Sequence, residues 1–268
     1  MAELQGFILG LIQGLTEFLP LSSSGHLVLF QKLFGLTKGT FTFNIAVHLA
    51  TLIGVIIVLK KEVMEVLRKP FGKLSMLVVA GTIPTVIIAA VFYGTFKKSI
   101  ETGTTLGIEF IFTGLALWFA ESIRSKNKGL TQTTYGDAAV MGVAQAIAIL
   151  PAVSRSGLTL AGALMRGLNR EFALKLSFLM SIPAILMGAA SDGYDLFKKG
   201  STAAENIEVL PLIIGFIAAG ISGYFAVKFM IRIFSKTSLK MFSYYVFALG
   251  LLILADQLFF NLLFERPF

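Results

Sequence analysis

The sequence predicts an all-α polytopic membrane protein, and three observations support this fold class. Hydrophobic residues make up 56% of the 268 residues and charged residues only 14%, and the mean hydropathy is +0.82, well outside the range of ordinary soluble chains. Several apolar stretches reach the roughly 20 residues that a helix needs to cross a hydrocarbon core of about 30 Å. None of them alternates apolar and polar residues as the strands of a membrane barrel do. We therefore expect membrane-spanning helices along the whole chain.

The apolar segments predict six transmembrane helices and two broken, re-entrant hairpins within a single membrane domain, residues 1–268. Residues 4–34 are apolar but interrupted at Pro20 and three serines. Because proline removes a backbone donor and clashes with the preceding turn, two half-length helices fit this segment better than one span. A second interrupted segment, 137–168, follows a polar link from Arg124 to Thr134. Continuous spans are expected at 41–59, 74–93, 105–122, 172–190, 209–231 and 241–263. The N-terminal segment lacks the basic start and cleavage site of a signal peptide, so we expect it to be retained.

The second half of the chain resembles the first, which predicts inverted repeats at about 1–128 and 129–268. Three short motifs recur in the same order: Gly10-Leu-Ile-Gln13 as Gly142-Val-Ala-Gln145, Leu19-Pro20 as Leu150-Pro151, and Ser22-Ser-Ser-Gly25 as Ser154-Arg-Ser-Gly157. Each copy holds one broken hairpin and three spans, and an odd number of crossings turns the second copy upside down. Inverted repeats place their binding site near the middle of the membrane, where broken helices meet.

The basic residues orient the spans. With the N-terminus outside, fifteen lysines and arginines fall on inner segments and seven on outer ones, and this bias favours both termini outside. We interpret the net charge of +8 as topology, with the membrane and no nucleic acid as the partner. The chain has no cysteine, which excludes disulfides, thiolate catalysis and cysteine metal sites. The oligomeric state stays open, and a homodimer is one arrangement consistent with the sequence.

The first hairpin carries a polar run inside very apolar sequence. It contains an acid, Glu17, then the three hydroxyls of Ser22, Ser23 and Ser24, and then Gly25 and His26. Gln13 lies four residues before Glu17, on the same helical face. A buried acid beside an anion site suggests Mg²⁺ or Ca²⁺ held by the Gln13 and Glu17 oxygens; alternatively Glu17 is protonated or orients His26. Serine, histidine and acid together could form an activated nucleophile or an acid–base pair.

The second hairpin carries Arg155, a permanent charge with no acid near it in sequence. A charge at the bilayer centre costs about 2.5 to 3.5 kcal/mol on insertion scales, so Arg155 needs an anion. Its planar fork suits carboxylate or phosphate, and Ser154, Ser156 and Thr159 add hydroxyls around it. We favour an anionic ligand; the alternative is a structural ion pair with Glu17 or Glu109.

Both hairpins resume with a glycine just before an apolar helix. The free backbone N–H groups at the starts near Gly25 and Gly157 form a phosphate site, although serine and glycine also cap helices without any ligand. His48, between two apolar residues, is expected to hydrogen-bond a neighbouring helix. Glu109, in the third span, has no assigned role.

These motifs resemble a known family, and they span nearly the whole chain. Gln13-x-x-x-Glu17, Pro20-x-Ser-Ser-Ser-Gly25-His26 and Pro151-x-x-Ser154-Arg155-Ser156-Gly157-x-Thr159 are similar to those of bacterial undecaprenyl-diphosphate phosphatases of the bacitracin-resistance type. The resemblance implies a divalent-cation-dependent hydrolase of the bacterial cytoplasmic membrane, with its active site facing the extracytoplasmic side. It would convert undecaprenyl diphosphate to undecaprenyl phosphate and phosphate, recycling the lipid carrier for peptidoglycan synthesis.

By matching position, the resemblance implies roles for individual residues. Glu17 falls on a motif acid, Ser23 on the proposed nucleophilic serine, His26 on the essential histidine and Arg155 on the phosphate-binding arginine, while Gln13 occupies the first motif position. Ala152 stands where the family commonly has glycine. Another class remains open: a transporter or flippase could bind a phosphorylated lipid or solute through the same groups without hydrolysing it.

Overall fold

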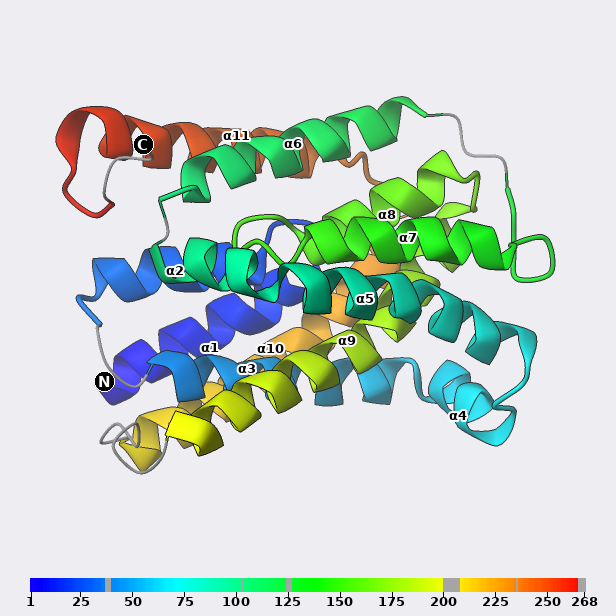
Figure 1. Cartoon of the computed structure of the whole chain (residues 1–268), viewed down its shortest axis with the longest axis horizontal. Coiled ribbons are helices and arrows are strands. Elements are labelled where there is room, and N and C mark those ends of the chain that lie inside the picture. Colours follow the sequence, from blue (N-terminus) through cyan, green and yellow to red (C-terminus); the bar gives the residue numbers. More distant parts are fainter. Residues whose placement is uncertain (37–39, 103, 124–126, 200–207, 235, 265–268) are drawn as a thin grey trace.

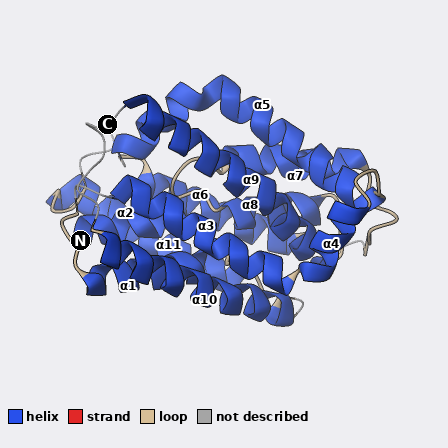
Figure 2. Cartoon of the chain, turned by 90° about the horizontal axis from the view of Figure 1, so that it is seen from below, coloured by secondary structure: helices blue, strands red, loops and turns tan. Residues whose placement is uncertain are grey.

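The structure is a computed structural model of a helical bundle (Figures 1 and 2). It describes residues 1–36, 40–102, 104–123, 127–199, 208–234 and 236–264. Part of the link at Arg124, and four of the basic residues counted for topology (Lys38, Arg124, Lys126 and Arg266), lie outside these ranges. Within them there is no β-sheet, only one isolated bridge between Lys128 and Leu168. The predicted all-α class is confirmed.

The helices follow one another with short connections. In chain order they are α1 (Glu3–Glu17), α2 (Ser23–Leu33), α3 (Thr40–Val58), α4 (Lys60–Arg68), α5 (Lys73–Thr102), α6 (Leu106–Ser122), α7 (Tyr135–Ile147), α8 (Arg155–Met165), α9 (Arg170–Lys199), α10 (Val209–Ile233) and α11 (Lys240–Ala255), which continues into a π-helical turn (Asp256–Phe260). In this described part, five helices are long and apolar enough to cross a membrane: α3, α5, α9, α10, and α11 with its π turn. The chain is therefore a multi-pass membrane protein. The 17-residue α6 is shorter than these five.

Some helix boundaries differ from the predicted ones. Helices α5 and α9 each have 30 residues, about ten more than the spans expected at 74–93 and 172–190. The helix α4 was not predicted at all. Hydropathy detects only the part of a helix that is apolar, whereas these helices continue into polar sequence.

The first helix of each broken hairpin packs closely against a helix from the other half of the chain. Helix α1 crosses α10, where a Cβ atom on Gly10 would lie 2.3 Å from the Gly215 carbonyl oxygen. Helix α7 crosses α5, where a Cβ on Gly142 would lie 1.9 Å from the Gly81 carbonyl oxygen. Glycine is needed at both crossings, as in close helix contacts within membranes. Each half of the chain thus packs its broken hairpin against a helix of the other half, as two intertwined repeats would. The repeat itself stays a prediction.

The connecting segments gather at two ends of the bundle. The start of α1 and the π turn after α11 lie at the left end in Figure 1, whereas α4 and the start of α7 lie at the right. At that end the buried Asp137 carboxylate binds Lys128 at 3.1 Å and Arg166 at 2.8 Å. Burial by itself raises the pKa of Asp137. The Thr134 backbone N–H and these two cations lower it by more, so that the pKa falls to about 2. The ionised Asp137 carboxylate therefore stabilises the folded protein fully above pH 3.8, the ordinary pKa of the group. This stabilisation of the fold is lost as the pH falls through about 2.

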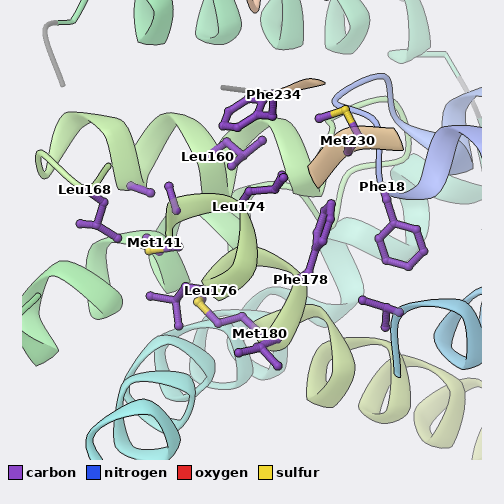
Figure 3. Packing of buried hydrophobic residues seen from close by; sticks show 14 of the residues in the cluster. Phe18, Met141, Leu160, Leu168, Leu174, Leu176, Phe178, Met180, Met230 and Phe234 are labelled. Atoms are coloured by element: carbon purple, nitrogen blue, oxygen red, sulfur yellow. The ribbon is translucent and has the colours of Figure 1, made fainter. Parts of the chain in front are cut away.

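Buried apolar side chains from both halves form the core beside the hairpin tips (Figure 3). Phe18, directly after Glu17, is fully buried and meets Phe178 of α9 edge to face, with ring centroids 5.2 Å apart. Leu160 of α8 and Leu174 of α9 belong to the same cluster. This packing fixes the ends of the broken helices, and with them the polar residues that they carry.

Candidate active site

Glu17, at the end of α1, is the centre of a buried polar cluster. Its Oε1 accepts a hydrogen bond from Arg155 Nη2 at 2.5 Å, and its Oε2 accepts from Gln13 Nε2 at 2.8 Å and from the Ser23 hydroxyl. His48 Nε2 lies 3.7 Å from Oε2. Glu17 is only 6% exposed. Four predicted site residues from both hairpins therefore meet here, together with His48, which we expected only to bridge helices.

Arg155 begins α8 and forms the ion pair with Glu17 that the sequence left as an alternative to an anionic ligand. Glu109 does not share this pair. The contact uses one terminal nitrogen of the guanidinium, which has five N–H donors in a planar fork, and 17% of the Arg155 side chain is exposed. The pair therefore holds the guanidinium at the hairpin tips and leaves donors for a phosphate.

The two hairpin turns bind each other reciprocally. The Ser22 hydroxyl of the first donates to the Pro151 carbonyl oxygen of the second at 2.6 Å, and the Ser156 hydroxyl of the second donates to the Leu19 carbonyl oxygen of the first at 2.8 Å. A Cβ on Gly25 would lie 3.0 Å from Ala152 Cα and 2.7 Å from the ring of Phe110. Glycine at this position thus lets the turns touch, and the tips meet as predicted.

Serine caps both resumed helices. The Ser22 Oγ accepts the Gly25 N–H at 3.4 Å, and the Ser154 Oγ accepts the Gly157 N–H at 3.1 Å. Ser22 also has a positive φ of 67°, a conformation that non-glycine residues rarely adopt and that is associated with functional turns. Serine therefore caps both helices, and a phosphate would use the other N–H groups of these helix starts.

Glu109, unexplained by the sequence, supports the second turn. Its Oε2 accepts the Ala152 N–H at 2.7 Å, and its Oε1 accepts the Thr105 hydroxyl at 2.6 Å. One turn further along α6, the Thr113 hydroxyl donates to the Ala152 carbonyl oxygen at 2.9 Å and accepts the Ser154 N–H at 3.1 Å. One face of α6 therefore holds the backbone directly before Arg155.

The described hydrogen bonds of His26 go to a backbone carbonyl oxygen and to a tyrosine hydroxyl. Its Nδ1 contacts the Ser22 carbonyl oxygen at 2.7 Å, and its Nε2 contacts the Tyr245 hydroxyl at 2.8 Å. Among the described contacts, neither ring nitrogen binds the hydroxyl of Ser22 or Ser23, so a serine–histidine pair is not assembled here. The Ser23 hydroxyl instead pairs with Glu17. Sequence could not have indicated Tyr245, which lies in an unremarkable apolar span 219 residues away from His26.

Two further predicted substrate-binding residues are Thr159 and Ser24. Thr159 is fully buried; its hydroxyl donates to the Arg155 backbone carbonyl oxygen at 2.8 Å and contacts the Ser177 hydroxyl of α9 at 2.5 Å, so it joins α8 to α9. Ser24 is half-buried on α2.

The Gln13 and Glu17 side chains fit a divalent cation in part. Gln13 Oε1 is buried and has no hydrogen-bond partner, which is an orphaned oxygen beside a carboxylate. The described residues contain no group of three histidine, cysteine, aspartate or glutamate side chains that could enclose an ion. Mg²⁺ commonly binds through one or two protein oxygens plus substrate phosphates and water, and this donor set suits that mode.

The fold and the cluster together define a multi-pass helical membrane protein with a buried arginine–carboxylate site between two broken hairpins. The chain belongs to the family of the bacitracin resistance protein BacA, whose model matches residues 6–252. It is 53% identical to the "Undecaprenyl-diphosphatase" of Carboxydothermus hydrogenoformans over 257 residues, which cover 96% of this chain and 98% of that protein. It is 44% identical to "Undecaprenyl-diphosphatase 3" of Bacillus cereus over the same shares. It is 40% identical to the "Undecaprenyl-diphosphatase" of Halothermothrix orenii, over 92% of this chain and 95% of that protein.

Proposed function

We propose that this protein hydrolyses undecaprenyl diphosphate to undecaprenyl phosphate and phosphate. It thereby recycles the carrier lipid for peptidoglycan synthesis and confers bacitracin resistance. Family membership and relatives of that name support the activity. The observation that supports the site is the convergence of Arg155 and Ser23 on Glu17, because an anion-binding fork and a hydroxyl nucleophile are then adjacent to one carboxylate.

The geometry suggests a role for each group. Arg155 binds the diphosphate and stabilises charge that develops on the transferred phosphoryl group. The Ser23 oxygen attacks the terminal phosphorus while its proton passes to Glu17; the bridging P–O bond breaks and undecaprenyl phosphate leaves. Water then attacks the phosphoserine, giving its proton to the neutral nitrogen of His26, and Ser23 recovers its proton from Glu17. Inorganic phosphate is released and His26 returns its proton to solvent.

A phosphate-release assay tests this function. Purified protein in detergent should release phosphate from a C15 to C55 prenyl diphosphate, and Arg155→Ala should retain almost none of that activity. Arg68→Ala is the control, since Arg68 is exposed at the end of α4 and lies outside the cluster. A transporter or flippase would release no phosphate in detergent, so absence of release by the unaltered protein would contradict the proposal.

The reaction is proposed to need Mg²⁺ or Ca²⁺ at Gln13 and Glu17. The cation would neutralise phosphate charge beside a carboxylate that otherwise repels it. We expect activity to vanish in excess chelator and to return with added Mg²⁺. Glu17→Ala should lose most of the activity and Gln13→Ala less, because a neutral amide contributes one weak oxygen ligand. Full turnover in chelator would contradict the cation and leave Glu17 as a proton carrier.

The proposed membrane arrangement has six transmembrane helices, with α6 as the sixth, and two re-entrant hairpins, α1–α2 and α7–α8. Seventeen residues reach the short limit of known membrane spans. The charge bias supports an orientation in which both termini, and the opening of the first hairpin, face the extracytoplasmic side of the bacterial cytoplasmic membrane.

A further inference from the structure

The contact between His26 and Tyr245 has no role in the proposed mechanism so far. His26 is 2% exposed and is contacted by two aromatic rings from different helices: Phe110 of α6 edge-on, with centroids 5.5 Å apart, and Tyr245 of α11 nearly parallel, with centroids 5.6 Å apart. The Tyr245 hydroxyl lies 2.8 Å from Nε2. Tyr245 itself is 46% exposed, so it connects a buried imidazole to the outside of the bundle.

The two polar contacts of His26 define which ring nitrogen carries the proton. The Ser22 carbonyl oxygen at Nδ1 can only accept, so Nδ1 is protonated. In the neutral ring Nε2 then has the lone pair, and the Tyr245 hydroxyl donates to it. Nε2 is therefore the nitrogen that can take a proton from water.

We propose that Tyr245 is a positioning residue for His26, an inference that rests on the proposed hydrolase function. Its hydroxyl holds the Nε2 lone pair in one orientation until substrate and water arrive, and its ring, with that of Phe110, prevents the imidazole from turning. In catalytic histidines a contact at the nitrogen that does not react fixes the tautomer and the ring orientation. The Ser22 carbonyl oxygen has that place at Nδ1, and the Tyr245 hydroxyl adds a contact at Nε2 that the water replaces. Helix α11 thus contributes to a site otherwise built from the hairpins, α3 and α6.

Kinetics separate this role from simple packing. Tyr245→Phe keeps the ring and removes the hydroxyl, and we expect kcat to fall roughly tenfold with KM changed less than about twofold, as for the loss of one hydrogen bond to a reacting group. Tyr244→Phe is the matched control: the neighbouring ring packs on Trp118, 5.4 Å between centroids, and is 59% exposed. Its kcat should equal that of the unaltered protein.

A double-mutant cycle tests whether Tyr245 acts through His26. In a His26→Gln background, Tyr245→Phe should change the residual activity less than about twofold, because the shared contact is already lost. An equal loss in both backgrounds would overturn the proposal.

Nitrogen NMR tests the contact without activity. The chain has only two histidines, so ¹⁵N-histidine labelling gives few signals, and His26→Gln assigns those of His26. We expect a protonated Nδ1 and an unprotonated Nε2, with the Nε2 resonance shifted in Tyr245→Phe and unchanged in Tyr244→Phe. An Nε2 signal unaffected by Tyr245→Phe would overturn the inference. Failure of the unaltered protein to release phosphate would instead contradict the proposed function, and the NMR result would still decide whether the contact exists.

Discussion

At the scale of single residues, the ion pair between Arg155 and Glu17 unites two interpretations that the sequence set against each other. The arginine has a structural partner 2.5 Å away, and it still presents donors to a ligand, because a guanidinium has more donors than one carboxylate oxygen can use. Breaking a buried pair by removing one partner leaves an uncompensated charge. Single substitutions at this pair therefore mix effects on folding with effects on activity.

A doubly neutral variant separates the two effects. Arg155→Leu/Glu17→Gln should fold and remain monodisperse in detergent, because no charge is left unpaired, yet release almost no phosphate from a prenyl diphosphate. Arg155→Lys should keep a minor fraction of the activity, since lysine retains the charge but not the planar fork. Size-exclusion chromatography and the release assay measure both properties. Substantial activity in the double variant would show that the arginine serves folding alone.

At the scale of elements, α6 holds the second hairpin turn through the side chains of Glu109 and Thr113, which we call the α6 clamp. Glu109 and Thr113, one helical turn apart, together hold the N–H and carbonyl of Ala152 and the N–H of Ser154. These backbone groups immediately precede Arg155. The position of the guanidinium therefore depends on a helix that contributes no charged group to the central cluster.

Removal of one clamp hydroxyl should weaken catalysis more than binding. Thr113→Val is nearly isosteric and leaves two backbone groups unpaired, so we expect a loss of stability of about 1 to 3 kcal/mol and a lower kcat. Thr113→Ser keeps the hydroxyl, so its stability and its kcat should stay near those of the unaltered protein. Thr82→Val is the control, because the described hydrogen bond of the Thr82 hydroxyl goes to the Val78 carbonyl oxygen of its own helix. Thermal unfolding and steady-state kinetics measure the outcome; a kcat as high in Thr113→Val as in Thr82→Val would contradict the clamp.

At the scale of the whole molecule, the charge bias predicts on which side of the membrane each end of the bundle lies. The chain has no cysteine, so a single introduced cysteine is a unique label. Leu262 and Phe71 are 80% and 90% exposed near the two opposite ends of the bundle. In intact cells, an impermeant maleimide should label Leu262→Cys, and should label Phe71→Cys only after permeabilisation. The reverse pattern would place the opening of the first hairpin on the cytoplasmic side.

Much of this architecture was accessible from sequence because its determinants are local. Pro20 and Pro151 with their following serines marked both broken helices, which end at Glu17 and Ile147. The meeting of the tips followed from the predicted repeat. The contacts of Glu109 with Ala152 and of Tyr245 with His26 could not be predicted, because they join distant segments through side chains that no local pattern distinguishes.

The charge balance of the resting site has a further consequence. Arg155 and Glu17 neutralise each other, so either a phosphate or the proposed cation arriving alone would leave one charge unbalanced in a medium of low dielectric. When both arrive together, the charges of cation and phosphate offset each other, and Arg155 and Glu17 each keep a partner of opposite charge. Each should therefore raise the affinity for the other, by the same factor in both directions. Prenyl monophosphate carries less charge than the diphosphate, so it gains less from replacing the contact between Arg155 and Glu17. The ion pair of the empty site therefore also favours release of the product.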